Sequence, residues 1–91
     1  MIYAEISEGE DTVVKIKGHA DEKVCAAVSG LFYALLAYLE ESGSAIKKST
    51  VEPGEAELVF NCENKEAFKM FTSGLYGIEK EHKESLYTVK Y

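Results

Sequence analysis

Two side chains that can do nucleophilic chemistry lie close together in the sequence, His19 and Cys25. His19 ends a strand-like run, and Cys25 opens the longest apolar helix candidate. At a helix start, unpaired backbone N–H groups and the helix dipole favour the reactive thiolate. An imidazole one short loop away is suited to take the thiol proton and return it to a leaving group. The spacing therefore predicts a Cys–His pair, with a small buried cysteine and a turn histidine as the structural alternative.

Three neighbours of this pair are candidates for supporting roles. Gly18 suits a tight bend or a close approach beside His19. The backbone N–H groups around Cys25 and Ala26 are candidates for an oxyanion hole, because a helix start presents unpaired donors. Ser29 lies one helical turn after Cys25 and either faces the same site or packs in the core.

The other cysteine and the other histidine carry no comparable signal. Cys62 follows Asn61 at the end of a strand with no base beside it in sequence, which indicates a structural residue. His82 lies among charged residues near a helix end, where it is expected to be solvated. No CxxC or HxxxH spacing occurs, so neither a metal site nor a cofactor is expected.

Length and charge exclude several classes of protein. Ninety-one residues make one domain, spanning residues 1–91. A net charge of −6 argues against a nucleic-acid-binding surface, which needs a basic stripe. No basic flank precedes an apolar run at the start, and the charge-free stretch 24–39 is short of a membrane span. The chain is therefore expected to be cytoplasmic, away from membranes, in the reducing compartment that a free thiol requires.

Hydrophobic periodicity predicts five strands and two helices in the order ββαββαβ. Alternation indicates strands at 2–7, 12–17, 46–52, 55–61 and 86–91, the first four forming two hairpins. Helices are predicted from 22 or 23 to 41, with Asp21 as N-cap and Gly43 at the end, and over 65–82, started by Asn64. Pro53 and Gly54 form the turn of the second hairpin. Gly74 and Gly77 either weaken the second helix or permit close packing. This order predicts an α+β fold with a mostly antiparallel sheet and two helices.

The first helix is apolar on nearly every side. Its core stripe is expected to be Val24, Ala27, Val28, Leu31, Leu35, Tyr38 and Leu39, and Phe32, Tyr33 and Leu36 add apolar bulk elsewhere. A monomer of this size can scarcely cover such a helix, so we expect a homodimer in which it contributes to the interface. A central helix wrapped by strands and loops is the alternative.

Three segments resemble the ribosomal-processing cysteine protease (Prp) family. Residues 18–20 resemble its Gly-His-Ala motif, and residues 24–31 resemble the motif in which Val-Cys-Ala-Ala opens a helix. Residues 74–82 are similar to the end of the family's second helix. The likeness in length and element order covers nearly the whole chain.

The resemblance implies a specific activity. Members of the family are cytoplasmic homodimeric cysteine proteases that remove a short N-terminal extension from large-subunit ribosomal protein twenty-seven, cutting after two aromatic residues. Carried onto this sequence, the nucleophile is Cys25 and its base is His19. The resemblance also implies a sheet lying between the two helices, and a ribosomal protein precursor as the peptide substrate.

Two features depart from the family pattern. The loop between His19 and Cys25 is shorter than usual in the family, and Glu22 stands where an aspartate is normal, with its carboxylate orienting His19 or capping the helix. Two other functional classes therefore stay open. One is a non-catalytic dimeric module that binds a peptide or ribosomal protein, and the other is a small structural or regulatory dimer.

Overall fold

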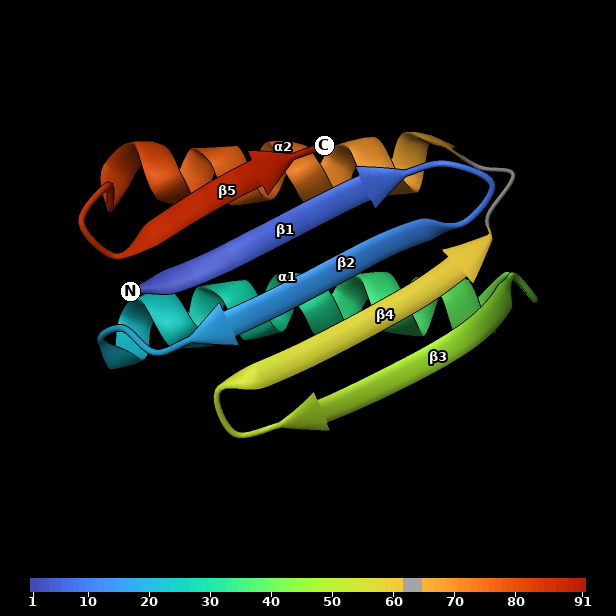
Figure 1. Ribbon diagram of the computed structural model, residues 1–91, viewed down its shortest axis with the longest axis horizontal. Helices are drawn as coiled ribbons and strands as arrows, with labels where there is room; N and C mark the ends of the chain where they lie inside the picture. Colours follow the sequence, from blue (N-terminus) through green and yellow to red (C-terminus); the bar gives the residue numbers. More distant parts are fainter. Residues whose placement is uncertain (62–64) are drawn as a thin grey trace.

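The computed structural model describes residues 1–61 and 65–91, which form a five-stranded sheet and two long helices. The predicted order ββαββαβ is confirmed (Figure 1). Cys62 and Asn64 lie outside the described residues. The elements are β1 (Ile2–Glu8), β2 (Thr12–Gly18), α1 (Glu22–Glu41), β3 (Ala45–Glu52), β4 (Glu55–Asn61), α2 (Lys65–Glu81) and β5 (Leu86–Lys90).

The sheet has the strand order β3-β4-β2-β1-β5. The pairs β1–β2, β2–β4 and β3–β4 are antiparallel, while β5 pairs parallel with β1, so the predicted mostly antiparallel sheet is confirmed. Gly54 has a φ of 77° in the Pro53–Gly54 turn, as the sequence predicted. The β3–β4 pairing shifts register between Ile46 and Lys48, which marks a bulge near the start of β3.

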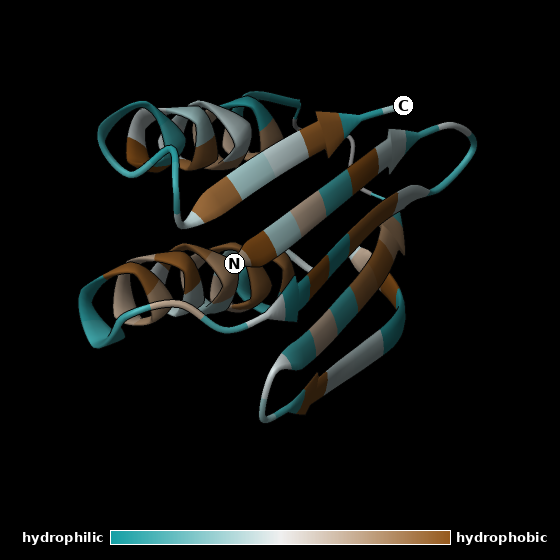
Figure 2. Cartoon of the chain, turned by 60° about the vertical axis from the view of Figure 1, so that its left-hand side comes forward, coloured by the Kyte–Doolittle hydropathy of each residue, from teal (hydrophilic) through white to brown (hydrophobic). Residues whose placement is uncertain are grey.

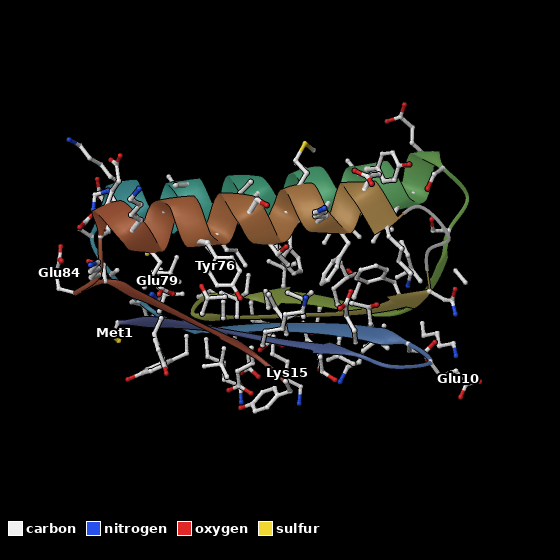
Figure 3. All side chains as sticks on the ribbon, turned by 90° about the horizontal axis from the view of Figure 1, so that it is seen from above. Met1, Glu10, Lys15, Tyr76, Glu79 and Glu84 are labelled. Atoms are coloured by element: carbon white, nitrogen blue, oxygen red, sulfur yellow. The ribbon has the colours of Figure 1, made fainter. Side chains whose placement is uncertain are left out.

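Both helices lie on the same face of the sheet (Figure 3). The expectation of a sheet between the helices is therefore wrong. The connections β2-α1-β3 and β4-α2-β5 each join parallel strands, but they start from strands of opposite direction and move toward opposite edges of the sheet. Right-handed crossovers of this kind place both helices on one side.

Apolar and polar residues alternate along the strands (Figure 2), and this alternation gives the sheet one apolar and one polar face. Ile2, Ala4 and Ile6 are buried beneath the helices. The opposite face is open and carries ion pairs such as Lys48–Glu57 at 2.7 Å and Lys15–Glu57 at 3.9 Å. A sheet with only one apolar face needs helices on that face alone.

Helix α1 begins and ends as the sequence predicts. Asp21 is the N-cap, and its carboxylate accepts a hydrogen bond from the Val24 N–H at 3.1 Å. Gly43, just beyond Ser42, has a φ of 73°, the left-handed conformation that glycine tolerates best.

The buried stripe of α1 differs in part from the predicted one. Phe32 is buried in the core, whereas Ala27 is exposed and Leu31 is only partly buried. Leu31 packs against α2 at Gly74, where an added Cβ would lie 2.9 Å from one Leu31 methyl carbon. Gly74 therefore permits a close helix approach, one of the two roles that the sequence allowed for it. A Cβ at Gly77 would meet nothing within 4 Å.

The whole of α1 is long and apolar enough to cross a membrane, although its charge-free central stretch is shorter. Its buried side chains, from Val24 to Leu39, pack into the core cluster beneath the sheet. Packing of this kind accounts for the buried part of the helix, which is 28% of the apolar window.

Candidate active site

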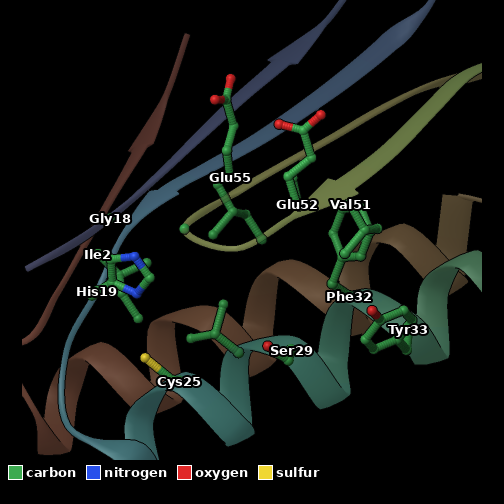
Figure 4. A pocket seen from close by; sticks show the side chains of 14 residues that line it. Ile2, Gly18, His19, Cys25, Ser29, Phe32, Tyr33, Val51, Glu52 and Glu55 are labelled. Carbon is green, nitrogen blue, oxygen red and sulfur yellow. The ribbon is translucent and has the colours of Figure 1, made fainter.

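A hollow of about 150 Å³ lies where the start of α1, the end of β2 and the tip of the β3–β4 hairpin meet (Figure 4). His19, Cys25, Ser29 and Gly18 all line it. Its other lining side chains are mostly apolar, among them Ile16, Val28, Phe32, Tyr33 and Val51. The fold therefore brings the two candidate reactive side chains to one water-accessible hollow with an apolar wall.

Gly18 makes the bend that aims His19 at this hollow. Its φ of 104° favours glycine, and a Cβ there would overlap the carbonyl oxygen of Met1. The Gly18 N–H donates to the Gly54 carbonyl at 2.9 Å, which ties the end of β2 to the hairpin turn. Both roles proposed for Gly18 from the sequence, bend and close approach, occur at this position.

The imidazole of His19 rests on the turn of the β3–β4 hairpin. A Cβ built on Gly54 would overlap Nε2 and would lie 3.0 Å from Cε1 and 3.2 Å from Cδ2. The ring can occupy this place because residue 54 has no side chain. A residue far from His19 in sequence thus determines where the candidate base sits.

Cys25 lies in the first turn of α1, half-buried, with its sulfur against the backbone of Ala20. The Ala20 N–H donates to Sγ at 3.3 Å, and the thiol donates to the Ala20 carbonyl at 3.4 Å. The short loop thus folds back onto the thiol. A backbone N–H beside the sulfur is also suited to a negatively charged thiolate.

The imidazole and the thiol share the hollow without bonding to each other. Figure 4 shows the Cys25 sulfur pointing from α1 toward the side of the hollow where His19 lies. Among the described residues, no hydrogen bond joins the two side chains, and the thiol bonds to Ala20 instead. Catalytic hydrogen bonds are often loose without substrate and tighten when it binds.

The other supporting residues fall into two groups. Ser29 lines the hollow, so it faces the candidate site. Glu22 and Ala26 are both exposed on α1 and do not line the hollow. The helix is capped by Asp21, so Glu22 is not the cap.

The proposed oxyanion donors need a correction. The Cys25 N–H already donates to the Asp21 carbonyl at 3.0 Å, because Cys25 is far enough into α1 to close the first helical hydrogen bond. The unpaired donors predicted at the helix start therefore do not include Cys25. The Ala20 N–H donates to the sulfur, so it is the candidate backbone donor beside the reacting atom.

The hairpin residues of the hollow were not identified from the sequence as site residues. Val51, Glu52, Gly54, Glu55 and Ala56 line it, although they lie far from the His–Cys motif along the chain. A strand order that puts β4 beside β2 brings them there, and a single sequence does not state that order. The Pro53–Gly54 turn itself was predictable.

No group of three or more histidine, cysteine or acidic residues is placed to hold a metal ion among residues 1–61 and 65–91. The site described above combines a thiol, an imidazole and a hydroxyl with a mostly apolar wall, and Glu52 and Glu55 of the hairpin also line it. Such a set of groups can carry out acyl transfer through a covalent intermediate.

Solved structures share the fold over its full length. A structure of the ribosomal processing protease Prp from Staphylococcus aureus with a covalently linked product peptide superposes at a TM-score of 0.86 and 20% identity, covering 100% of both chains. The same protease with a substrate peptide gives 0.85 at 17% identity, again over 100% of both chains. SMU.848 from Streptococcus mutans gives 0.76 at 20% identity, covering 99% of this chain and 93% of that one.

No protein-family model matches the sequence, and a search of curated proteins finds no match. At the identities above, the comparisons establish that this chain has the fold of the Prp protease structures. The activity must therefore be argued from the residues of the hollow.

Proposed function

We propose that this chain is a Prp-type cysteine endopeptidase with Cys25 as nucleophile and His19 as general base. The observation that carries the proposal is the convergence of both side chains on one hollow at the start of α1. The shared fold supports it, because two of the superposed structures are described as a protease with a product or substrate peptide.

The chemistry follows from the groups present. His19 takes the proton from the Cys25 thiol, and Sγ attacks the carbonyl carbon of the scissile peptide bond. The imidazolium then gives its proton to the leaving amine as the C–N bond breaks, which leaves a thioester. Water hydrolyses the thioester, with His19 accepting a proton from water and returning one to the thiolate.

For the imidazole to serve the thiol, the contacts of the sulfur with Ala20 must loosen. The thiol proton now points to the Ala20 carbonyl at 3.4 Å. A substrate carbonyl entering the hollow would displace that contact, and the Ala20 N–H would be left as a donor to the developing oxyanion. Substrate binding and assembly of the reactive pair are thus coupled in this proposal.

The proposed substrate is the precursor of large-subunit ribosomal protein twenty-seven, and the cleavage would support ribosome assembly. The apolar wall of the hollow, with Phe32, Val51 and Ala56, supports a substrate that presents large apolar side chains near the cleaved bond. The proposed location of this activity is the cytoplasm.

The proposed active form is a homodimer assembled through α1. A largely apolar groove of about 300 Å³ runs between the outer sides of α1 and α2, lined by Leu31, Tyr38 and Met70 among others. Met70 is 73% exposed in the single chain. An exposed groove of this kind is typical of a surface that a partner covers.

Two measurements on the full chain test the activity. Cys25 should react with iodoacetamide much faster than Cys62 at neutral pH, followed by mass spectrometry of the labelled peptides. A peptide spanning the aromatic cleavage site of the precursor should be cut by the parent protein and left intact by Cys25→Ala. Equal, slow alkylation together with no cleavage would overturn the proposal.

One observation favours a second candidate, a non-catalytic dimeric module that binds a peptide or ribosomal protein. The thiol is bonded to the Ala20 backbone rather than to the imidazole, and the loop joining them is short. Tight binding of the precursor peptide without cleavage would identify this module. If the precursor peptide is neither bound nor cleaved, a structural or regulatory role remains.

A further inference from the structure

Strand β3 offers a free edge at the mouth of the hollow. Within the described residues it is the outermost strand of the sheet, with β4 as its neighbour. Val51, near its C-terminal end, lines the hollow and is 46% exposed. Tyr33 of α1 lines the same hollow and is 52% exposed. The mouth of the hollow therefore lies beside backbone groups that a further strand could pair with.

The direction of those backbone groups follows from the neighbouring strands. The Gly18 N–H donates to the Gly54 carbonyl, so the even-numbered residues of the hairpin end and β4 bond toward β2. The odd-numbered residues Glu55 and Glu57 then bond toward β3, where their partners are Glu52 and Thr50. The main-chain groups of Ser49 and Val51 consequently point outward from the sheet.

Two other parts of the sheet edges carry features that oppose strand addition. At the opposite edge, the Glu79 carboxylate accepts from the Thr88 N–H of β5. At the start of β3 the register shifts between Ile46 and Lys48, and Lys47 pairs with Asp11 at 2.8 Å. Bulges and lysines are common devices for blocking an edge. The segment Ser49–Glu52, next to the hollow, has neither.

The charge of this segment selects what kind of strand fits. Glu52 and Glu55 are paired directly across the hairpin end, and neither forms an ion pair within the described residues. Their side chains extend away from α1 (Figure 4), on the face opposite to that of Val51. Lys17 of β2 is the neighbour of Glu55 on this face, so Glu52, on the outer strand, is the acid that favours a positive partner.

We propose that an extended peptide adds to β3 as a further strand along Ser49–Glu52. The residue opposite Val51 is aromatic or aliphatic and enters the hollow, and the adjacent residue, opposite Glu52, is lysine or arginine. Side chains of successive strand residues point to opposite faces, so one apolar and one basic neighbour satisfy both environments. That this peptide is the substrate rests on the function proposed above, whereas the mode of binding does not.

Binding can be measured without cleavage on the Cys25→Ala variant. The probe is a fluorescent peptide of valine and threonine with one phenylalanine beside one lysine, made in both orders and followed by fluorescence anisotropy. N-methylation of an amide that points to β3 should weaken binding about tenfold, the effect of losing one hydrogen bond. N-methylation of the next amide should leave binding unchanged. Equal effects at successive amides would overturn strand addition.

Two protein variants test the place and the charge. Ser49→Pro removes an outward N–H and no bond to β4, so it should weaken peptide binding about tenfold, while Ser49→Ala should leave it unchanged. Glu52→Lys should weaken the lysine peptide about fivefold and favour a glutamate peptide, whereas Glu84→Lys on the α2–β5 turn should do neither. If Ser49→Pro does not fold, the N-methyl series on the Cys25→Ala chain decides alone.

The outcomes separate this inference from the proposed activity. If the parent protein cleaves the precursor peptide but N-methylation weakens binding equally at successive amides, strand addition is overturned and the proposed peptidase activity stands. If N-methylation weakens binding only at every second amide while Cys25 does not react with iodoacetamide and no cleavage occurs, strand addition is supported and the peptidase is overturned. Self-association that Ser49→Pro abolishes, with no peptide binding, would assign the β3 edge to a second copy of the chain and overturn the inference.

Discussion

The backbone of Gly54 lies directly against the imidazole of His19, so that a β-carbon at position 54 would come within 3.0 Å of Cε1. The turn of the β3–β4 hairpin thus contacts the candidate base and determines the position of its ring. The N–H of Gly18, the residue before His19, donates a hydrogen bond to the Gly54 carbonyl, so the same turn also holds the backbone next to His19.

Gly54→Ala should impair activity beyond its effect on folding. Alanine at a positive φ costs about 1 kcal/mol of stability, and the new methyl group would also displace the ring. Misplacement of a catalytic group by about 1 Å can lower the rate about 100-fold, so we expect a large fall in kcat/KM. Peptide cleavage and thermal unfolding measure the two effects.

Gly43→Ala is the matched control, because Gly43 has a φ of 73° and a Cβ there meets nothing within 4 Å. It should lose similar stability while keeping kcat/KM close to that of the parent. Equal kcat/KM for both variants would mean that Gly54 does not position His19.

Asp21→Ala should destabilise the protein by about 1 kcal/mol, since the Val24 N–H loses its capping carboxylate. Glu22→Ala should cost less, because Glu22 is exposed and the helix is capped by its neighbour. Urea unfolding of the two variants compares the losses. A larger loss of unfolding free energy for Glu22→Ala than for Asp21→Ala would mean that Asp21 is not the residue that caps α1.

Gly77→Ala should stabilise the protein by about 0.8 kcal/mol, because alanine is the better helix former and open space surrounds this position. Gly74→Ala should gain less or lose stability, since its methyl group would lie 2.9 Å from a Leu31 methyl carbon. Thermal melts at one protein concentration report the difference. Equal gains would show that α1 and α2 are not closely packed at Gly74.

Met70→Lys should disrupt the proposed dimer with little loss of monomer stability. Met70 is exposed and lines the apolar groove between the helices, so a charge there opposes burial against a second copy. Sedimentation velocity should show dimers for the parent and monomers for the variant. Tyr87→Lys, on the opposite face of the sheet, should leave the dimer in place.

Acid should weaken one ion pair of the open face. The hydrogen bond from Lys48 holds the pKa of Glu57 below its ordinary value of 4.5. A carboxyl whose pKa is lowered by folding stabilises the native state above the unfolded pKa, and this contribution is lost as pH falls through the native pKa. Urea unfolding between pH 7 and pH 3 should therefore show a smaller acid loss for Glu57→Gln than for the parent.

Local chemistry made most of the elements predictable. Asp21 and Gly43 mark the ends of α1, Pro53 and Gly54 mark a turn, and strict alternation marks β1 and β2. Each of these signals acts over a few residues, so a single sequence contains it.

Long-range relationships were harder to predict. The side of the sheet that α2 covers depends on the direction of β4, which follows from its pairing with β2. The pairing of β4 with β2 also brings Gly54 against His19, so the position of the imidazole depends on a residue far away in sequence. Phe32 looked like surplus apolar bulk on α1, yet it is in the core, because the stripe facing the sheet includes it in place of Ala27.

Two of the stretches of chain that line the hollow are distant in sequence, one holding the thiol and imidazole and the other, at the hairpin tip, holding Val51 and Glu52. Under the proposed function, these stretches can be altered independently. A library confined to the hairpin tip, with Gly54 left unchanged, would redirect which peptides are cut while the bond-breaking groups keep their geometry. The protein would then be a small protease whose peptide specificity can be changed without altering its catalytic residues.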